Sequence, residues 1–536
     1  MIKVVLLAVN AKYVHSSLSV WVIAEGITRF AQSQHDVHVV EATINQKLPD
    51  IVELVSVHKP DVIGISSYIW NAGILSELMS LLRERLPGVV IVLGGPEASN
   101  NADYWLQNGA DYVLNGEGEY IFPQFLDARQ GDGSSVLLQR ESKTDEPSPC
   151  LVFPGEAYLN ALKGRLAYIE TSRGCPFQCA FCLSARSSVK YFPLDLVKEQ
   201  IYKLSMADTK TLKFVDRTFN CNAERAYEIF EYVINLDTAC TFHFEAAADL
   251  FDTHMLTLLE AAPPGRIQFE IGLQSFFEPA LKASSRQMNV EKAEQNIRAL
   301  LRMQNIHIHI DLIAGLPYET LSDFMNGFDQ AYALNAHHLQ LGFLKLLHGS
   351  KLRKQADEYG IQFSSEPPYE IICNNWLSAG DIQRLKHTEN ALQHTYNKGR
   401  FLSTLHYVKT ATGTRPFSLM ESLGANVPNH GTQLEGYVVQ IYDYFKGLQG
   451  VEENALQDCM IYDWLGMVKG KNAPAFLKNE TNHRKHIAEV AGRLLSRNMK
   501  REEIAILNSG LGVFVDSNDR NPVTGLYRIY ICGIDR

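Results

Sequence analysis

Three cysteines lie within eight residues in the segment TSRGCPFQCAFC, at Cys175, Cys179 and Cys182. Gly174 and Pro176 beside them predict a loop. Thiolates are soft ligands that favour zinc, copper(I) or an iron–sulfur cluster. Structural zinc takes four protein ligands and no fourth is evident nearby, so the triplet favours a four-iron cluster with one iron open to a small molecule. The alternative, three unrelated core cysteines, is disfavoured by this spacing on a Gly/Pro loop.

The composition limits the class of protein. A chain of 536 residues, 46% hydrophobic and 21% charged, is typical of a soluble protein of about two to four domains. Nine cysteines, an odd number, predict a reducing compartment and a cytoplasmic location rather than a disulfide scaffold. The net charge of −10 gives no overall attraction to nucleic acid or anionic lipid. The early apolar run Val4–Val9 falls well short of the roughly 20 residues of a membrane-spanning helix, so we expect no stable membrane insertion.

Residues 1–127 alternate short β-branched runs with segments long enough for a helix. This pattern predicts a doubly wound α/β domain with a parallel five-stranded sheet, whose ligands bind beyond the carboxyl ends of the strands. The expected strands are Val4–Val9, Val37–Val40, Val62–Ser66, Val89–Leu93 and Tyr112–Leu114.

Residues 128–160 are rich in Gly, Ser, Asp, Glu and Pro and are predicted to form a linker. A second alternation follows over residues 161–350. Six βα units predict a partial (β/α)6 barrel similar to a TIM barrel, with its chemistry at the loops that follow the strands. The expected strands are Ala167–Thr171, Thr211–Val215, Thr241–Ala246, Arg266–Ile271, His307–Ile313 and Leu339–Leu346.

Residues 351–536 predict a mostly helical C-terminal domain that covers the substrate, with a β-rich last stretch from Gly512 to Ile534. Residues 482–501 hold six Lys or Arg against one acid. On a helix they would form a basic face able to meet phosphate of RNA or anionic lipid, although a solvated surface is the commoner meaning of such a run.

The cysteine triplet, with Phe181 before its last member, resembles the radical S-adenosylmethionine superfamily. The resemblance implies a [4Fe–4S] cluster whose open iron is chelated by S-adenosylmethionine, and whose electron cleaves it to a 5′-deoxyadenosyl radical. Downstream segments resemble the coproporphyrinogen-oxidase-like branch, in which such positions hold the methionine and ribose parts. The predicted S-adenosylmethionine contacts are Phe181, Asp216, Glu245, Gln274, Arg286 and Asp311.

The first domain resembles the cobalamin-binding domains of the cobalamin-dependent radical S-adenosylmethionine enzymes. The likeness rests on DVIGISSYIWN, VIVLGGPEAS and YVLNGEGEY, which follow the third, fourth and fifth expected strands. Small residues there let backbone and hydroxyl groups reach a nucleotide tail. The implied cobalamin contacts are Ser66, Ser67, Gly94, Gly95, Pro96, Gly116 and Glu117, with Tyr13 facing the lower side of the ring.

One motif departs from the usual cobalamin pattern. Many such domains carry Asp-x-His-x-x-Gly after the first strand, where the His coordinates cobalt. Here NAKYVH places Asn10, Lys12 and His15 at the three key positions, so we expect binding without that imidazole. The alternative is a vestigial domain that only positions the barrel.

The combined resemblance implies a methyltransferase that acts at an unactivated carbon by means of a 5′-deoxyadenosyl radical and methylcobalamin. The alternatives are a rearrangement, cyclisation or redox reaction with the same cofactors, and a non-catalytic iron–sulfur or corrinoid sensor or carrier. The substrate could be a small molecule, lipid or RNA, and flavodoxin or ferredoxin is the expected reducing partner. The sequence does not identify the catalytic side chains.

Overall fold

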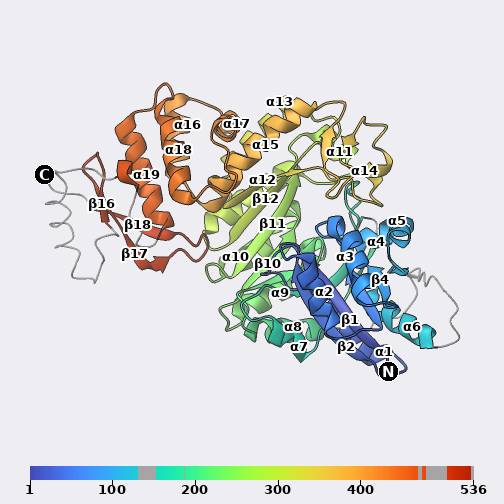
Figure 1. The fold of residues 1–536 in the computed structure, drawn as a ribbon. Coiled ribbons are helices and arrows are strands. Elements are labelled where there is room, and N and C mark those ends of the chain that lie inside the picture. The colour runs from blue at the N-terminus through green and yellow to red at the C-terminus, as the bar shows by residue number, and fades with distance from the viewer. Residues whose placement is uncertain (131–151, 186, 469–473, 478–503, 533–536) are drawn as a thin grey trace. The chain divides into compact units, whose positions relative to one another are not determined.

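The computed structural model describes residues 1–130, 152–185, 187–468, 474–477 and 504–532 (Figure 1). The chain forms two compact units, which are described separately. The first comprises Met1–Leu250, Ser284–Gln287 and Leu344–Asn374. The second comprises Phe251–Ala283, Met288–Phe343 and Asn375–Arg536.

The first unit begins with a parallel five-stranded sheet in the order β2-β1-β3-β4-β5. Its strands are β1 (Lys3–Asn10), β2 (Asp36–Thr43), β3 (Val62–Ser66), β4 (Val90–Gly94) and β5 (Tyr112–Leu114). Its helices are α1 (Leu18–Phe30), α2 (Leu48–Ser56), α3 (Ala72–Arg85), α4 (Pro96–Asn100), α5 (Ala102–Gln107) and α6 (Gly118–Gln130). The chain order reverses between β1 and β3, which marks the point where such sheets bind ligands.

Both faces of this sheet are buried, which explains the unbroken apolar runs in the sequence. Alternate residues of β1 point to opposite faces. Val5, Leu7 and Val9 pack in the core under α2 and α3. Val4, Leu6 and Ala8 pack in the other core with α1 and α6.

The rest of the first unit begins with three parallel strands in the order β10-β9-β6. Its elements are α7 (Glu156–Ala161), β6 (Ala167–Ile169), β7 (Ser172–Cys175), β8 (Ser187–Tyr191), α8 (Leu194–Met206), β9 (Thr211–Phe214), η1 (Phe219–Cys221), α9 (Ala223–Asn235), β10 (Thr241–Ala246) and η2 (Ala248–Leu250). A later segment adds α14 (Lys351–Lys354), β14 (Gln362–Phe363) and β15 (Ile371–Cys373).

The second unit contains three further parallel strands, paired β11 with β12 and β12 with β13. Its α/β part consists of α10 (Thr253–Glu260), β11 (Ile267–Gln274), α11 (Glu278–Ala283), α12 (Val290–Met303), β12 (His307–Ala314), α13 (Leu321–Ala333) and β13 (His338–Phe343). The C-terminal part consists of α15 (Ala379–His394), η3 (Tyr396–Lys398), α16 (Leu402–Thr412), α17 (Pro416–Asn426), α18 (Leu434–Lys446), α19 (Glu453–Met467), η4 (Ala475–Leu477), β16 (Ile504–Ile506), β17 (Gly512–Arg520) and β18 (Tyr527–Cys532).

The predicted fold class is confirmed. All eleven expected strands exist within a few residues of their predicted bounds, and the C-terminal region is mostly helical with a β-rich end. The short antiparallel pair β7–β8 was not expected.

The predicted domain boundaries stay a prediction. Helix α6 runs past residue 127, and residues 344–374 group with the first unit. The basic stretch 482–501 lies outside the described residues.

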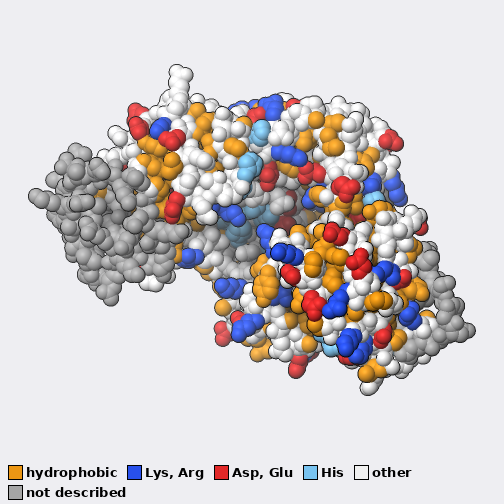
Figure 2. Space-filling view, viewed as in Figure 1, with side chains coloured by type: hydrophobic (Ala, Val, Ile, Leu, Met, Phe, Trp, Pro, Cys, Tyr) orange, Lys and Arg blue, Asp and Glu red, His pale blue; other side chains and the backbone are white. Residues whose placement is uncertain are grey.

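The described helices include none with the length and apolar character needed to cross a membrane. Lys, Arg, Asp and Glu side chains are interspersed over the face shown in Figure 2. That mixture fits the modest net charge of the sequence.

Candidate cofactor site

The cysteine triplet begins at the end of β7, in the connection between the two strands of the β7–β8 hairpin. Gly174 has φ +107°, and a Cβ there would lie 2.3 Å from the carbonyl oxygen of Ser188, so only glycine fits. The Cys175 amide donates to Ser187 Oγ at 2.9 Å. The Thr218 hydroxyl lies 3.7 Å from Cys175 Sγ. The hairpin therefore fixes the backbone of the first cysteine.

The three thiols are free. Cys175 and Cys179 are buried, whereas Cys182 and Phe181 are half-buried. Soft thiolate ligands on one loop suit an iron–sulfur cluster or another soft metal centre.

Asp216 anchors the strand that leads into the cysteine loop. It is 2% exposed, and its carboxylate accepts from the Thr171 amide at 3.0 Å, the Thr171 hydroxyl at 2.7 Å and the Ser172 hydroxyl at 2.5 Å. Burial raises its pKa to about 6, against the lowering effect of these donors. These contacts give Asp216 a positioning role, and its predicted contact with S-adenosylmethionine stays a prediction.

Two other segments of the first unit meet the cysteine loop. The Arg286 guanidinium lies 3.6 Å from Cys179 Sγ. The Ala180 amide donates to the Ser284 carbonyl at 2.8 Å, and the Ala180 carbonyl accepts from the Leu352 amide at 2.9 Å. The structure thus brings Arg286 to the cysteines, although the residues are far apart in sequence.

The other predicted S-adenosylmethionine contacts lie at or near the carboxyl ends of strands. Glu245 is on β10 in the first unit, whereas Gln274 on β11 and Asp311 on β12 belong to the second. Gln274 has φ +69°, and its buried Oε1 has no hydrogen-bond partner among the described residues. A buried amide oxygen without a donor is costly, so a bound ligand that donates a hydrogen bond would fit there.

Asp311 belongs to a group of polar side chains on one face of β11, β12 and β13. His309 Nε2 lies 2.9 Å from Asp311 Oδ1, and Glu270 and His338 stand opposite His309 in register. The ligand atoms of Glu270, His309 and Asp311 lie within 4.8 Å of one another. Burial lowers the pKa of His338 to about 4. This face of the three strands therefore brings the carboxyl groups of Glu270 and Asp311 together with His309 and the neutral ring of His338.

Glu319, in the loop after β12, is a buried acid that the sequence analysis did not identify. It is 1% exposed and accepts a short hydrogen bond from Ser275 Oγ. Burial raises its pKa to about 8. Because Ser275 follows Gln274 directly, this contact joins the loops after β11 and β12.

The predicted cobalamin loops lie at the carboxyl ends of the first sheet. Ser67 is fully buried, donates from Oγ to the Gly94 carbonyl at 2.8 Å and accepts from the Ala98 amide at 2.9 Å. Gly95 has φ +99°, and a Cβ there would approach the Ser67 carbonyl to 2.6 Å. Ser67 and Gly95 therefore shape the loops around Ser66, Gly94 and Pro96.

The loop after β5 is tied to the cysteine hairpin by charge. Arg173 on β7 lies 3.2 Å from Glu117, 2.9 Å from Glu119 and 2.6 Å from Glu170. Gly116 beside Glu117 has φ +122°. These carboxylates raise the pKa of the mostly buried Arg173. The predicted contact Glu117 thus also positions the cysteine loop.

The loop after β1 is organised by a buried ion pair. Arg165 Nη1 lies 2.6 Å from Glu41 Oε2, and the Ser17 amide at the start of α1 donates to Glu41 Oε1 at 2.7 Å. His15 Nδ1 lies 2.6 Å from the Tyr168 hydroxyl. Tyr13 is 76% exposed. His15 is therefore held by a barrel strand, and the role of Tyr13 below the corrin ring stays a prediction.

An aromatic pair at the reversal point of the sheet was missed. Tyr68 and Trp70 stack at 4.3 Å in the loop after β3, and the indole donates to the Val9 carbonyl at 3.1 Å. Trp70 is 44% exposed. An exposed, fixed ring at this position offers a flat apolar surface to a large planar ligand. Its signal was present in the segment SSYIWN.

A contact between distant segments completes the first unit. The Tyr369 hydroxyl donates to buried Glu97 on α4 at 2.6 Å, and the Arg353 guanidinium lies 5.0 Å from the centre of the Tyr369 ring. Burial raises the pKa of Glu97. The segment after the barrel strands therefore packs against the helix that follows the predicted cobalamin loop.

Family comparisons agree with this architecture. Residues 4–126 match the B12 binding domain, residues 169–331 match the radical SAM superfamily, and residues 357–508 match a family described as a protein of unknown function, DUF4080. The fold and sites thus define a protein that combines cobalamin-binding and radical S-adenosylmethionine domains. The chain is homologous to cobalamin-dependent radical S-adenosylmethionine methyltransferases.

Two curated relatives illustrate this homology. The cobalamin-dependent radical SAM methyltransferase TokK of Streptomyces tokunonensis is 26% identical over 57% of this chain and 50% of its own length. A 2-(S-pantetheinyl)-carbapenam-3-carboxylate methyltransferase of Streptantibioticus cattleyicolor is 25% identical over 52% and 46%. The chain therefore spans about half the length of these relatives.

Solved structures share the fold at low identity. The methyltransferase TsrM of Kitasatospora setae, with cobalamin and a [4Fe–4S] cluster bound, aligns with a TM-score of 0.55 and 17% identity over 68% of this chain and 78% of its own. The cobalamin-dependent radical enzyme OxsB, with aqua-cobalamin bound, aligns with a TM-score of 0.57 and 13% identity over 87% and 79%.

Proposed function

We propose that this protein is a cobalamin-dependent radical S-adenosylmethionine methyltransferase that acts on an unactivated carbon. The observation that carries the proposal is the combination, in one chain, of three free thiols on a fixed hairpin and a sheet whose reversal point bears small residues and the exposed ring of Trp70. The homologous methyltransferases support the choice of reaction.

The proposed cofactors are a [4Fe–4S] cluster, S-adenosylmethionine and cobalamin. Cys175, Cys179 and Cys182 would hold the cluster, with Arg286 compensating sulfur charge. When bound, these cofactors supply a radical able to remove hydrogen from carbon and a methyl group to replace it. Such chemistry is needed because no side chain can remove a proton from an unactivated carbon.

The chain's own residues position and shield these groups. The Gln274 oxygen, which has no partner among the described residues, would accept a hydrogen bond from S-adenosylmethionine, and Asp311, Glu245 and Phe181 would be further contacts. Trp70 would offer its exposed ring to the corrin, and the Ser67–Gly95 turn would leave room for the nucleotide tail. Asp216 and Arg173 hold the hairpin so that the cysteines stay in place.

Substrate and partners belong to the same proposal. The substrate is a small molecule, a lipid or RNA, and a flavodoxin or ferredoxin supplies electrons. We infer a cytoplasmic location, because the thiols need a reducing compartment.

An anaerobic assay tests the proposal. Reconstituted protein receives hydroxocobalamin, a strong reductant and S-adenosylmethionine with a deuterated methyl group, together with an extract of cells that lack the protein. We expect 5′-deoxyadenosine, S-adenosylhomocysteine and a product that carries the labelled methyl. Cys182→Ala should abolish all three and the iron–sulfur absorbance, whereas the matched variant Cys373→Ala should retain them.

Two outcomes would contradict this function. 5′-Deoxyadenosine without any methylated product would indicate a rearrangement, cyclisation or redox reaction. Release of neither nucleoside product by protein with a full cluster would indicate a sensor or carrier.

A further inference from the structure

A cavity of about 910 Å³ lies within the second unit, at the amino-terminal ends of its parallel strands. Pro264, Gln304 and His337 on its wall precede β11, β12 and β13 respectively. Gln274 and the loop that holds Glu319 lie at the opposite, carboxyl ends of these strands. The cavity is therefore separate from the cofactor contacts of this unit.

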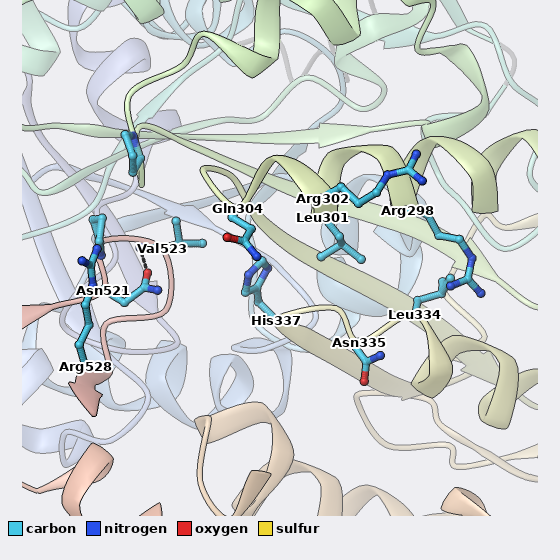
Figure 3. Close-up of a pocket in the computed structure, with 12 residues that line it drawn as sticks. Arg298, Leu301, Arg302, Gln304, Leu334, Asn335, His337, Asn521, Val523 and Arg528 are labelled. Carbon is cyan, nitrogen blue, oxygen red and sulfur yellow. Dashed lines mark hydrogen bonds between the residues drawn. The ribbon is translucent and has the colours of Figure 1, made fainter. Parts of the chain in front are cut away.

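The charged side chains on the cavity wall are all cationic. Arg298 and Arg302 lie one helical turn apart on α12, and Arg528 comes from β18 (Figure 3). A neighbouring cavity of about 330 Å³ shares Asn335 and His337 and adds Lys398 and Lys409. No described Asp or Glu lines either cavity, although the whole chain has a net charge of −10.

Three of these cations have no carboxylate partner among the described residues, namely Arg302, Lys398 and Lys409. Arg298 pairs with Glu294 at 2.7 Å, and Arg528 lies 3.6 Å from Asp519. In the larger cavity, Arg302 therefore lies one helical turn from Arg298 without a described carboxylate of its own, and an anionic ligand would relieve the repulsion between these two cations. Guanidinium groups match phosphate geometry with paired hydrogen bonds.

One wall is built by the loop between β17 and β18, and it is preformed. Asn521 Oδ1 accepts from the amides of Val523 and Thr524 at 2.8 and 3.2 Å. A Cβ at Gly265, where φ is +78°, would lie 2.5 Å from the Pro522 carbonyl oxygen. The barrel loop therefore needs glycine there for this close approach.

The rest of the lining suits a polar ring. His337 Nδ1 accepts from the Ile308 amide at 3.0 Å, and burial lowers the pKa of His337, so its neutral ring carries hydrogen on Nε2. The Gln304 amide lies beside it, with Val523 across the cavity (Figure 3). The volume of about 910 Å³ lies within the range of roughly 300–1,000 Å³ that is typical of small-molecule sites.

We propose that this cavity binds a phosphate-bearing ligand of nucleotide type, with the phosphates at Arg298 and Arg302 and the base near His337 and Val523. The phosphate comes either from a free nucleotide or from a nucleotide unit of RNA. In the RNA case the strand continues along Lys398 and Lys409. The proposal does not depend on the reaction at the cofactor site.

Binding to the full chain with its cluster, measured by fluorescence without turnover, tests the proposal. The probes are a fluorescent ATP analogue, a labelled single-stranded RNA of twelve uridines, and inorganic pyrophosphate as competitor. We expect Arg302→Glu to weaken binding by about tenfold or more. Lys292→Glu makes the same charge change on the same helix outside the cavity, and it should weaken binding less than about twofold.

The two probes distinguish the source of the phosphate. Tighter binding of the ATP analogue would assign the cavity to a free nucleotide, and tighter binding of the oligonucleotide would assign it to RNA. Equal losses of probe affinity in the two folded variants would overturn the proposal. Absence of saturable binding of both probes to the wild-type protein would also overturn it. Circular dichroism confirms that each variant is folded.

Discussion

Single buried acids hold the loops around the proposed site. Asp216 accepts three hydrogen bonds from Thr171 and Ser172, and these donors counteract the cost of burial. Among the described residues Glu319 accepts a side-chain hydrogen bond only from Ser275, and burial raises its pKa much further from the ordinary range. The two carboxyl groups therefore differ in charge at neutral pH because their surroundings differ.

The protonated state of Glu319 makes stability depend on pH. Its pKa rises from the ordinary value of 4.5 to about 8 in the folded protein, so the folded state binds the proton more tightly than the unfolded state. The contribution of this group to stability is present below about pH 4.5 and is lost as the pH rises through about 8. We expect the melting temperature of Glu319→Gln to fall less steeply than that of wild type between about pH 5 and 8. If the melting temperature fell equally steeply with pH in both proteins, Glu319 would already be ionised in this range.

At the scale of elements, the turn after β4 depends on glycine. Gly95→Ala forces a Cβ to within 2.6 Å of the Ser67 carbonyl at a positive φ. We expect a loss of about 1–3 kcal/mol in unfolding free energy and at least tenfold weaker cobalamin retention, measured by denaturation and by absorbance after gel filtration. Gly73→Ala on α3, where a Cβ meets nothing within 4 Å, should leave both unchanged. Equal effects of the two variants would contradict a role for this turn.

The contact between α4 and the segment that follows the barrel strands is a second element-scale feature. Tyr369→Phe removes the hydroxyl that donates to Glu97 and leaves a buried carboxylate without that donor. We expect a cost of about 1–3 kcal/mol and faster cobalamin dissociation, followed by stopped-flow absorbance. Tyr407→Phe, which removes a hydroxyl from α16, should not change the dissociation rate. An unchanged dissociation rate in Tyr369→Phe would show that the Tyr369–Glu97 hydrogen bond does not affect cobalamin binding.

The whole molecule divides its tasks between two units. The first contains the cysteine loop and the predicted cobalamin loops, and the second contains Gln274, Asp311 and the basic cavity. A ligand stabilises the regions that it contacts. We therefore expect cobalamin to slow hydrogen exchange in residues 66–71 and 94–97 and to leave α18 unchanged, as measured by mass spectrometry. Similar protection of α18 would contradict binding at the first sheet.

The amino-acid sequence by itself determined the strand order along the chain and supplied the three candidate cluster cysteines. Apolar β-branched runs indicate a parallel strand that is buried on both faces. The three cysteines lie close together in the sequence. Both signals are local, so they can be recognised without a fold.

Only the tertiary structure decided which distant residues support these elements. Arg286 lies beside Cys179 and Tyr369 meets Glu97, although long stretches of chain separate the partners. Glu319 has an unusual pKa because the fold removes it from water, which its position in the segment LPYET does not reveal. The basic cavity likewise arises where α12 and the loop between β17 and β18 meet. Long-range packing creates each of these environments, and no local pattern encodes it.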